Sequence, residues 1–152
     1  GRVRIEGFEF DYKQALTFLP RWARGVTVFV NGASQRILGP QGSGNFPGFI
    51  PRTGNATLSW RYKKFSTRIL YNFTGSYITA FTAATPGRNL YRFKYETINA
   101  GISYQVRPSL QLTLDAGNLT NEPQSFYRGI TAQMQNTILN GTTLTFGVNG
   151  RF

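Results

Sequence analysis

The sequence alternates apolar and polar residues with a period of two, in repeated runs of about ten residues. In the last run Leu144, Phe146 and Val148 share one face, and Thr143 and Thr145 share the other. A period of two is the side-chain period of a β-strand, and the 3.6-residue period of an amphipathic helix is nearly missing. We therefore expect an all-β chain whose strands each have one apolar and one polar face.

Seven such runs are predicted to be strands. They lie at residues 3–12, 26–31, 55–62, 65–77, 97–106, 110–117 and 141–152. In the first run the apolar positions change phase at Gly7, from Val3 and Ile5 to Phe8 and Phe10. Such a phase change predicts a β-bulge at this point.

The connections between these runs fall into two classes. Residues 62–65 and 106–109 leave room only for tight turns, and residues 15–25 form a longer connection on the same side. On the other side the connections are long and rich in Gly, Pro, Asn and Ser, at residues 37–51, 80–91 and 119–140. Short turns at one rim and long loops at the other are typical of an outer-membrane β-barrel.

Composition excludes most catalytic chemistry. The chain has no Cys and no His and only six carboxylates, so a thiol nucleophile, a Ser-His-Asp triad and the commonest metal ligand are all missing. We expect no enzyme activity and no cofactor or metal. The net charge of +11 would suggest nucleic acid as a partner of a soluble protein. The aromatic residues lie on the apolar faces and do not interleave with the basic ones, so no nucleic-acid binding is expected.

Three stretches resemble segments of the barrel of TonB-dependent outer-membrane receptors. The end of the chain, LTFGVNGRF at residues 144–152, resembles the terminal strand of outer-membrane proteins. AGNLTNEP at residues 116–123 is similar to a segment near the top of the family's penultimate strand. RIEGFEF at residues 4–10, followed by LTFLP at 16–20 and VFVN at 28–31, resembles a strand, periplasmic turn and next strand of the family.

This resemblance implies a 22-stranded transmembrane antiparallel barrel closed by an N-terminal plug. Seven strands are too few, and an odd antiparallel set does not close on itself, so residues 1–152 are expected to be the C-terminal part of the barrel. The only methionine is Met134, so Gly1 is not expected to be a translation start. The resemblance implies uptake of a scarce small-molecule nutrient at the outer membrane of a Gram-negative bacterium. Its implied partners are outer-membrane lipid and lipopolysaccharide, the remaining barrel strands, the plug and, through the plug, the TonB complex.

Candidate functional residues fall into three groups. Those expected to face the lumen and the plug are Glu9, Asp11, Arg61, Arg68, Asp115 and Arg151. Glu9 and Asp11 are predicted to form salt bridges and not a catalytic pair. Those implied as the signal for the barrel-assembly machinery are Leu144, Phe146, Val148 and Phe152. The third group consists of aromatic residues in the predicted loops. They are expected either to stack on a substrate or to pack the loops against each other, and they are Phe46, Phe49, Phe126 and Tyr127.

Two alternatives remain open from the sequence. A porin or a smaller structural outer-membrane barrel also has a terminal Phe and alternating strands, with an even strand count. A soluble, basic β-sandwich binding module also has alternating strands, with its apolar faces packed on a core.

Overall fold

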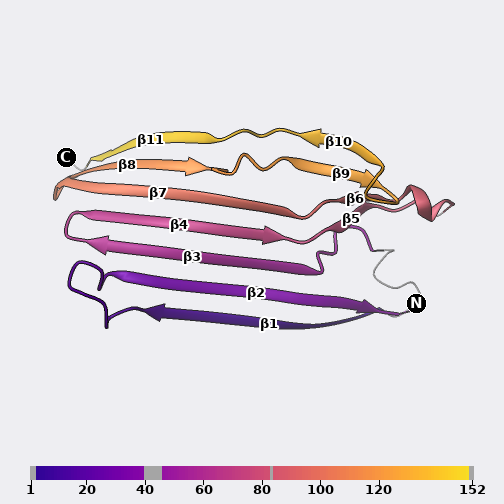
Figure 1. Ribbon diagram of the computed structural model, residues 1–152, viewed down its shortest axis with the longest axis horizontal. Helices are drawn as coiled ribbons and strands as arrows, with labels where there is room; N and C mark the ends of the chain where they lie inside the picture. Colours follow the sequence, from indigo (N-terminus) through magenta and orange to yellow (C-terminus); the bar gives the residue numbers. More distant parts are fainter. Residues whose placement is uncertain (1–2, 40–45, 83, 151–152) are drawn as a thin grey trace.

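The computed structural model describes residues 3–39, 46–82 and 84–150, and these form antiparallel β-structure. Seven strands make one sheet in the order β1-β2-β3-β4-β7-β8-β11 (Figure 1). They are β1 (Arg4–Ala15), β2 (Val26–Leu38), β3 (Arg52–Tyr62), β4 (Phe65–Thr74), β7 (Tyr95–Arg107), β8 (Leu110–Gly117) and β11 (Thr143–Gly150). The all-β, antiparallel prediction is confirmed, and each of the seven predicted runs corresponds to one strand of this sheet.

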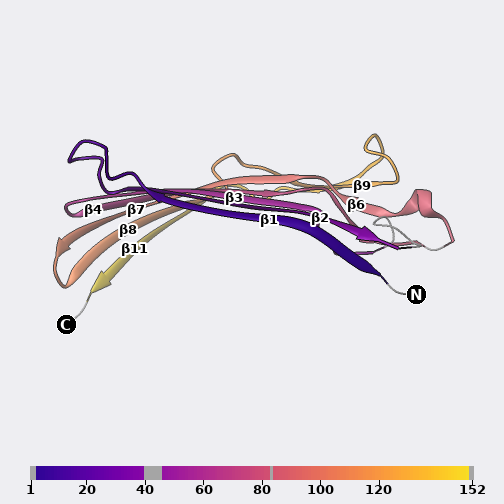
Figure 2. The same ribbon diagram turned by 90° about the horizontal axis from the view of Figure 1, so that it is seen from below.

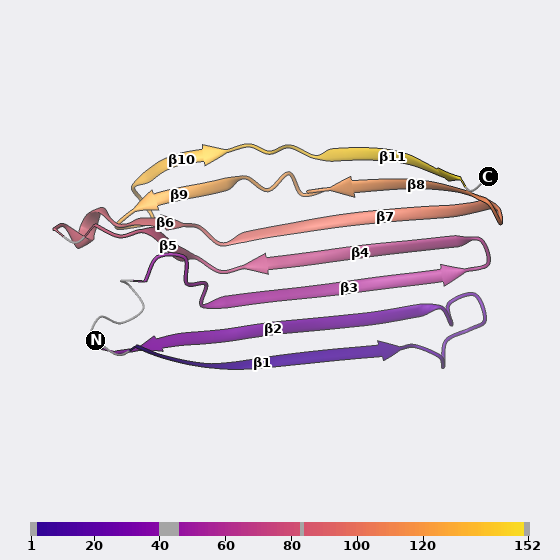
Figure 3. The same cartoon turned by 180° about the vertical axis from the view of Figure 1, so that it is seen from behind.

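A second, smaller sheet lies beyond the long-connection end of the first (Figures 1 and 3). Its order is β10-β9-β6-β5. Its strands are β5 (Tyr77–Ala80), β6 (Leu90–Arg92), β9 (Gln124–Arg128) and β10 (Met134–Ile138), and a short 3-10 helix (Pro86–Arg88) joins β5 to β6. We call this four-stranded unit the outer sheet and the seven-stranded one the main sheet.

The outer sheet corrects two predictions. Residues 80–91 and 119–140 were expected to be loops, but they contain or border β6, β9 and β10, because each long connection turns back on itself as a hairpin. The predicted strand at 65–77 is two strands. β4 ends at Thr74, the Gly75 N–H makes a last bond to the Arg52 carbonyl of β3, at 2.8 Å, and β5 begins at Tyr77.

The predicted bulge at Gly7 is absent. β1 pairs with β2 without a register shift, from Arg4 opposite Leu38 to Ala15 opposite Thr27. The strand is therefore unbroken. The change of phase in the sequence arises because each face of β1 changes from polar to apolar, or the reverse, at about Gly7. Glu6 shares a face with Phe8 and lies opposite Arg36, so the apolar face of β1 ends in charge toward the outer sheet.

Directly opposed residues in a sheet share a face, so the register sorts the whole main sheet into two faces. One continuous apolar row crosses six strands: Val28, Leu58, Ile69, Ala100, Ala116 and Leu144. A polar row on the other face crosses five: Asp11, Asn31, Asn55, Asn72 and Thr97. We call these surfaces the apolar face and the polar face of the main sheet.

Apart from the connection at 16–25, which contacts Trp60 near the short-turn end, nothing in the described residues covers the apolar face. Leu58 and Ile69, near its centre, are each 45% exposed, and Phe146 on β11 is 67% exposed. The buried hydrophobic residues of the described chain are only Ala23, Ile37 and Ile78. Seen edge-on, the main sheet is twisted and bowed, with no second layer against it (Figure 2).

The main sheet has two open edges. Its neighbouring strands are antiparallel throughout, so β1 and β11, the first and seventh, run in the same direction. They therefore cannot pair with each other in an antiparallel ladder.

Among the described residues, no helix is long and apolar enough to cross a bilayer.

Candidate functional site

The polar face carries the predicted charged residues. Glu9 and Asp11 of β1, Arg61 of β3, Arg68 of β4 and Asp115 of β8 all lie on it, as the register shows. Arg151 lies outside the described residues. The face is thus common to these five side chains, although they come from four strands.

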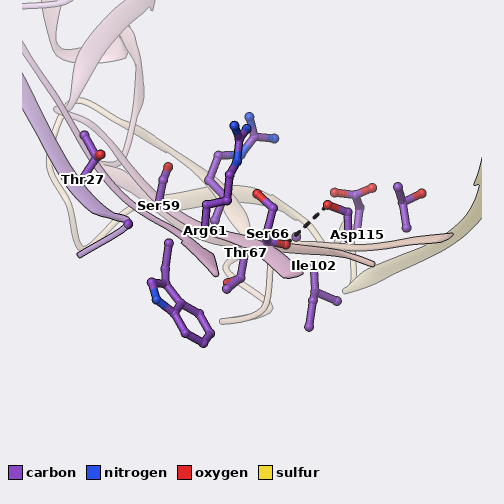
Figure 4. A pocket seen from close by; sticks show the side chains of 13 residues that line it. Thr27, Ser59, Arg61, Ser66, Thr67, Ile102 and Asp115 are labelled. Atoms are coloured by element: carbon purple, nitrogen blue, oxygen red, sulfur yellow. Dashed lines mark hydrogen bonds between the residues drawn. The ribbon is translucent and has the colours of Figure 1, made fainter. Parts of the chain in front are cut away.

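An open depression of about 500 Å³ lies on the polar face, close to its short-turn end. Figure 4 shows Arg61 and Asp115 rising from the polar face with the hydroxyls of Ser59 and Ser66, while Ile102 points the opposite way. Arg68 also lines it. Guanidinium and hydroxyl groups together donate hydrogen bonds to carboxylate or phosphate oxygens, so Arg61 and Arg68 suit an anionic group, whereas Asp115 in the same lining repels one.

Arg68 and Asp115 stand on either side of a position without a side chain. Arg68 is opposite Gly101, and Gly101 is opposite Asp115. A Cβ built on Gly101 would lie 2.6 Å from the Asp115 Oδ1 atom, so this carboxylate lies across the glycine. Within the described residues no ion pair joins Arg68 to Asp115. The side chains of Arg61 and Arg68 are both exposed.

Glu9 and Asp11 differ from their prediction. They line a second depression with Asn31, Thr53 and Asn55, but neither forms an ion pair with another described residue. The Gln35 amide instead donates a hydrogen bond to the Glu9 carboxylate, at 3.2 Å. The expected salt bridges therefore do not form within this part of the chain, because no basic side chain on β2 stands opposite either residue.

The terminal strand places its predicted residues on one face. Leu144, Phe146 and Val148 of β11 lie on the apolar face and are 69%, 67% and 58% exposed. Phe152, the fourth residue of the group, lies outside the described residues. The three large side chains have no packing partner of their own size across the open edge of β11, so they are available for contact with an outside surface.

The loop aromatics lie in two places. Phe46 and Phe49 lie in the connection between β2 and β3, where the Phe49 N–H donates to the Phe46 carbonyl, at 3.3 Å. Phe46 is 48% exposed, whereas Tyr127 and Phe126 lie on β9 and are half-buried. The Tyr127 ring stacks on Tyr91 at 5.2 Å and packs against Phe93 at 4.5 Å. Burial, with a smaller contribution from Tyr91, raises the pKa of Tyr127 above its ordinary value. Tyr127 therefore packs the two hairpins of the outer sheet against each other.

Asn118 has a role that sequence reasoning missed. It adopts a positive φ of 51° at the end of β8. Its side-chain amide donates to the Glu122 and Gly141 carbonyls, at 3.2 and 3.1 Å, and its Oδ1 accepts from the Glu122 N–H, at 2.9 Å. The backbone N–H of Asn118 donates a hydrogen bond to the Asn99 Oδ1 atom, at 2.9 Å. Asn118 thus closes the base of the connection between β8 and β11, and its place in the AGNLTNEP stretch was the available clue.

The two ends of the apolar face differ in charge. Toward the outer sheet, Glu6 forms ion pairs with Arg4 and Arg36, at 3.0 and 3.1 Å, and Lys94 pairs with Glu96, at 2.8 Å. The hydrogen bond to Glu96 raises the pKa of Lys94 above its ordinary value. In the described connections at the short-turn end the charged residues are all basic: Arg21, Arg24, Lys63, Lys64 and Arg107.

Comparison of this chain with family models, with curated proteins and with solved structures gives no match. Among the described residues, no three His, Cys, Asp or Glu side chains gather where one metal ion would bind.

Proposed function

We propose that this chain is the C-terminal part of the transmembrane β-barrel of a TonB-dependent outer-membrane receptor. In this role its apolar face contacts lipid, its polar face lines the lumen and contacts the plug, and its outer sheet lies at the cell surface near a captured nutrient. The observation that carries the proposal is the apolar face, which is continuous over the main sheet and has no cover in the described chain.

The dimensions of the apolar face support a membrane role. On β4 its apolar residues extend from Phe65 to Phe73, about 27 Å along a strand at about 3.4 Å per residue. At a strand tilt of about 40° this is about 20 Å across the sheet, close to the apolar band of about 25 Å in outer-membrane barrels. Each large apolar side chain left in water forgoes about 1.5–3 kcal/mol of burial free energy, so such a face requires an apolar surrounding.

The open edges support a larger barrel. Because β1 and β11 run in the same direction, antiparallel closure requires an odd number of further strands between them. The receptor assignment, as opposed to a porin, is supported by the motif positions. AGNLTNEP covers the last two residues of β8 and the start of the connection after it, with Asn118 between them, and LTFLP forms part of the connection between β1 and β2.

The membrane part of the proposal is tested by single cysteines, since this chain contains none. Cysteines placed one at a time at 65–73 of β4 in the full protein, in lipid vesicles, should alternate in their labelling. Positions 66, 68, 70 and 72 should react with a water-soluble maleimide, and positions 67, 69 and 71 should not. Equal reactivity at all positions would show that both faces meet water, which would contradict the membrane proposal.

The receptor part is tested by photo-cross-linking. A benzophenone amino acid at Ser66, on the polar face beside Arg61, should cross-link within the same polypeptide to a segment that precedes this barrel part. Mass spectrometry identifies the cross-linked peptide. A labelled barrel that alternates as above but yields no such peptide from Ser66 would be a porin or a structural barrel.

A further inference from the structure

From the short-turn end of the main sheet we infer that this rim binds the headgroups of anionic glycerophospholipids. The inference rests on the proposed membrane location of the apolar face and adds a partner that this location does not specify. The rim consists of the three connections at that end and the last residue of β7, at 16–25, 63–64 and 107–109.

The charge of the rim is of one sign. It holds five cations, Arg21, Arg24, Lys63, Lys64 and Arg107, and all of them are exposed. None of the six carboxylates lies in it, and the nearest in sequence, Asp11, is five residues away. No described carboxylate pairs with any of these cations. At the opposite end Glu6 pairs with Arg4 and Arg36, and Glu96 pairs with Lys94, so charges of both signs lie there, whereas the rim holds cations alone.

Aromatic side chains lie directly beside these cations on the apolar face. Trp60 stacks with Tyr62 at 6.0 Å, and Phe65 packs on Tyr104 at 4.6 Å. The Lys63 ammonium lies 5.3 Å from the centre of the Tyr62 ring. Amphipathic rings next to Lys and Arg are the side chains that proteins place at the level of lipid headgroups.

The connection at 16–25 presents large apolar side chains from an ordered backbone. Phe18 is 78% exposed and Trp22 61% exposed. The Trp60 indole N–H donates to the Trp22 carbonyl, at 2.7 Å, which holds this connection on the apolar-face side of the sheet. The connection rises out of the plane of the sheet (Figure 2). Exposed Phe and Trp beside Arg21 and Arg24 match the pattern of segments that lie in a membrane interface.

The turn between β3 and β4 adds a second indication. Lys63 has a φ of 51°, a conformation in which Gly or Asn is favoured in a two-residue hairpin turn. A lysine here costs backbone strain and contributes nothing to the ladder. Its charge lies at the tip of the turn, and the Lys64 ammonium beside it donates a hydrogen bond to the Val106 carbonyl of β7, at 3.2 Å. Phosphodiester groups at the lipid surface are the anions that lie at this level beside an apolar band.

The test compares two double variants of the full protein reconstituted in nanodiscs. Lys63→Gln with Lys64→Gln removes two rim charges, and Arg88→Gln with Arg128→Gln removes two exposed charges at the far end. Native mass spectrometry counts the phosphatidylglycerol molecules retained from mixed phosphatidylcholine and phosphatidylglycerol discs. We expect the rim variant to retain phosphatidylglycerol about 25-fold more weakly, from about fivefold per charge near an anionic surface, and the far-end variant to match the wild type.

The outcomes separate this inference from the proposed function. Normal cysteine alternation on β4 with no preference of the wild type for phosphatidylglycerol would overturn the lipid inference and leave the membrane proposal standing. An equal loss in both double variants would also overturn it, because net charge would then explain the binding. Loss of the alternation pattern in every disc would overturn the proposed function itself.

Discussion

The two sheets of this chain obtain their stability in different ways. The outer sheet has short strands but packs on itself, with Tyr127 against Tyr91 and Phe93, and Ile78 only 3% exposed. The main sheet has long, regular strands, yet its apolar face has no partner in the described chain. The comparison shows that the length of a strand does not determine how much of its apolar surface is buried. On the proposed function, the main sheet therefore depends on its surroundings more than the outer sheet does.

The largest expected effect tests that dependence at the centre of the main sheet. Leu58→Arg should destabilise the full protein in a bilayer by about 2–4 kcal/mol, because it puts a charge at mid-height of the apolar face. Thr57→Arg, its neighbour on the polar face, is the matched control and should cost less than about 1 kcal/mol. Denaturant titration of the protein folded in vesicles measures both. Equal costs would mean that the two faces have the same surroundings.

The next effect lies at the junction of the two sheets. Asn118→Ala removes three side-chain hydrogen bonds and puts alanine at a φ of 51°. We expect a loss of about 2–3 kcal/mol, at about 1 kcal/mol for each hydrogen bond with some compensation by water. Asn118→Gly tolerates the positive φ and isolates the hydrogen-bond part. Hydrogen exchange should accelerate in β9 and β10 and stay unchanged in β2 and β3; uniform acceleration would show that the sheets unfold as one unit.

A smaller effect is confined to the outer sheet. Tyr127→Ala removes two ring contacts, with Tyr91 and Phe93, and should destabilise the outer sheet locally by about 1–2 kcal/mol. Tyr127→Phe keeps both rings and should be nearly neutral. Exchange of the β6 and β9 amides reports the change. If β3 and β4 amides exchange faster as well, the outer sheet supports the main sheet and the contrast between them is weaker than described.

The smallest effect concerns the other end of the main sheet. Trp60→Phe removes the hydrogen bond to the Trp22 carbonyl and should cost about 1 kcal/mol. The connection at 16–25 should then open more often, with about fivefold faster tryptic cleavage after Arg21 and Arg24. Trp22→Phe keeps the carbonyl acceptor and should leave the cleavage rate unchanged. Unchanged cleavage in Trp60→Phe would show that the backbone bonds of the connection suffice to hold it.

The main sheet was predictable from sequence because its information is local and periodic. Every strand of it appears as a run of alternation, and the two faces follow from which residues alternate. The bulge at Gly7 was wrong for the same reason, since a change in the polarity of the surroundings along β1 imitates a change in backbone phase.

The outer sheet was not predictable in this way. Its strands are three to five residues long, as β6 and β9 show, too short to display a period. Their pairing joins residues about 36 positions apart, such as Tyr91 with Tyr127. The hydrogen bonds of Asn118 and Trp60 likewise depend on contacts across the sequence, so only the motif around Asn118 marked it beforehand.

The row of amide and hydroxyl side chains from Asn31 to Thr97 also bears on strand register, because a register shift would break hydrogen bonds within it. Asn55 bonds Asn31, at 2.9 Å, and Asn72 bonds Thr97, at 3.4 Å. If β4 paired with β3 one residue out of step, Asn72 would turn toward the apolar side and Thr97 would lose its hydrogen-bond partner. Because a period of two moves every side chain at once, the mistake would be penalised along the whole strand. The row therefore favours the correct strand register over a register shifted by one residue.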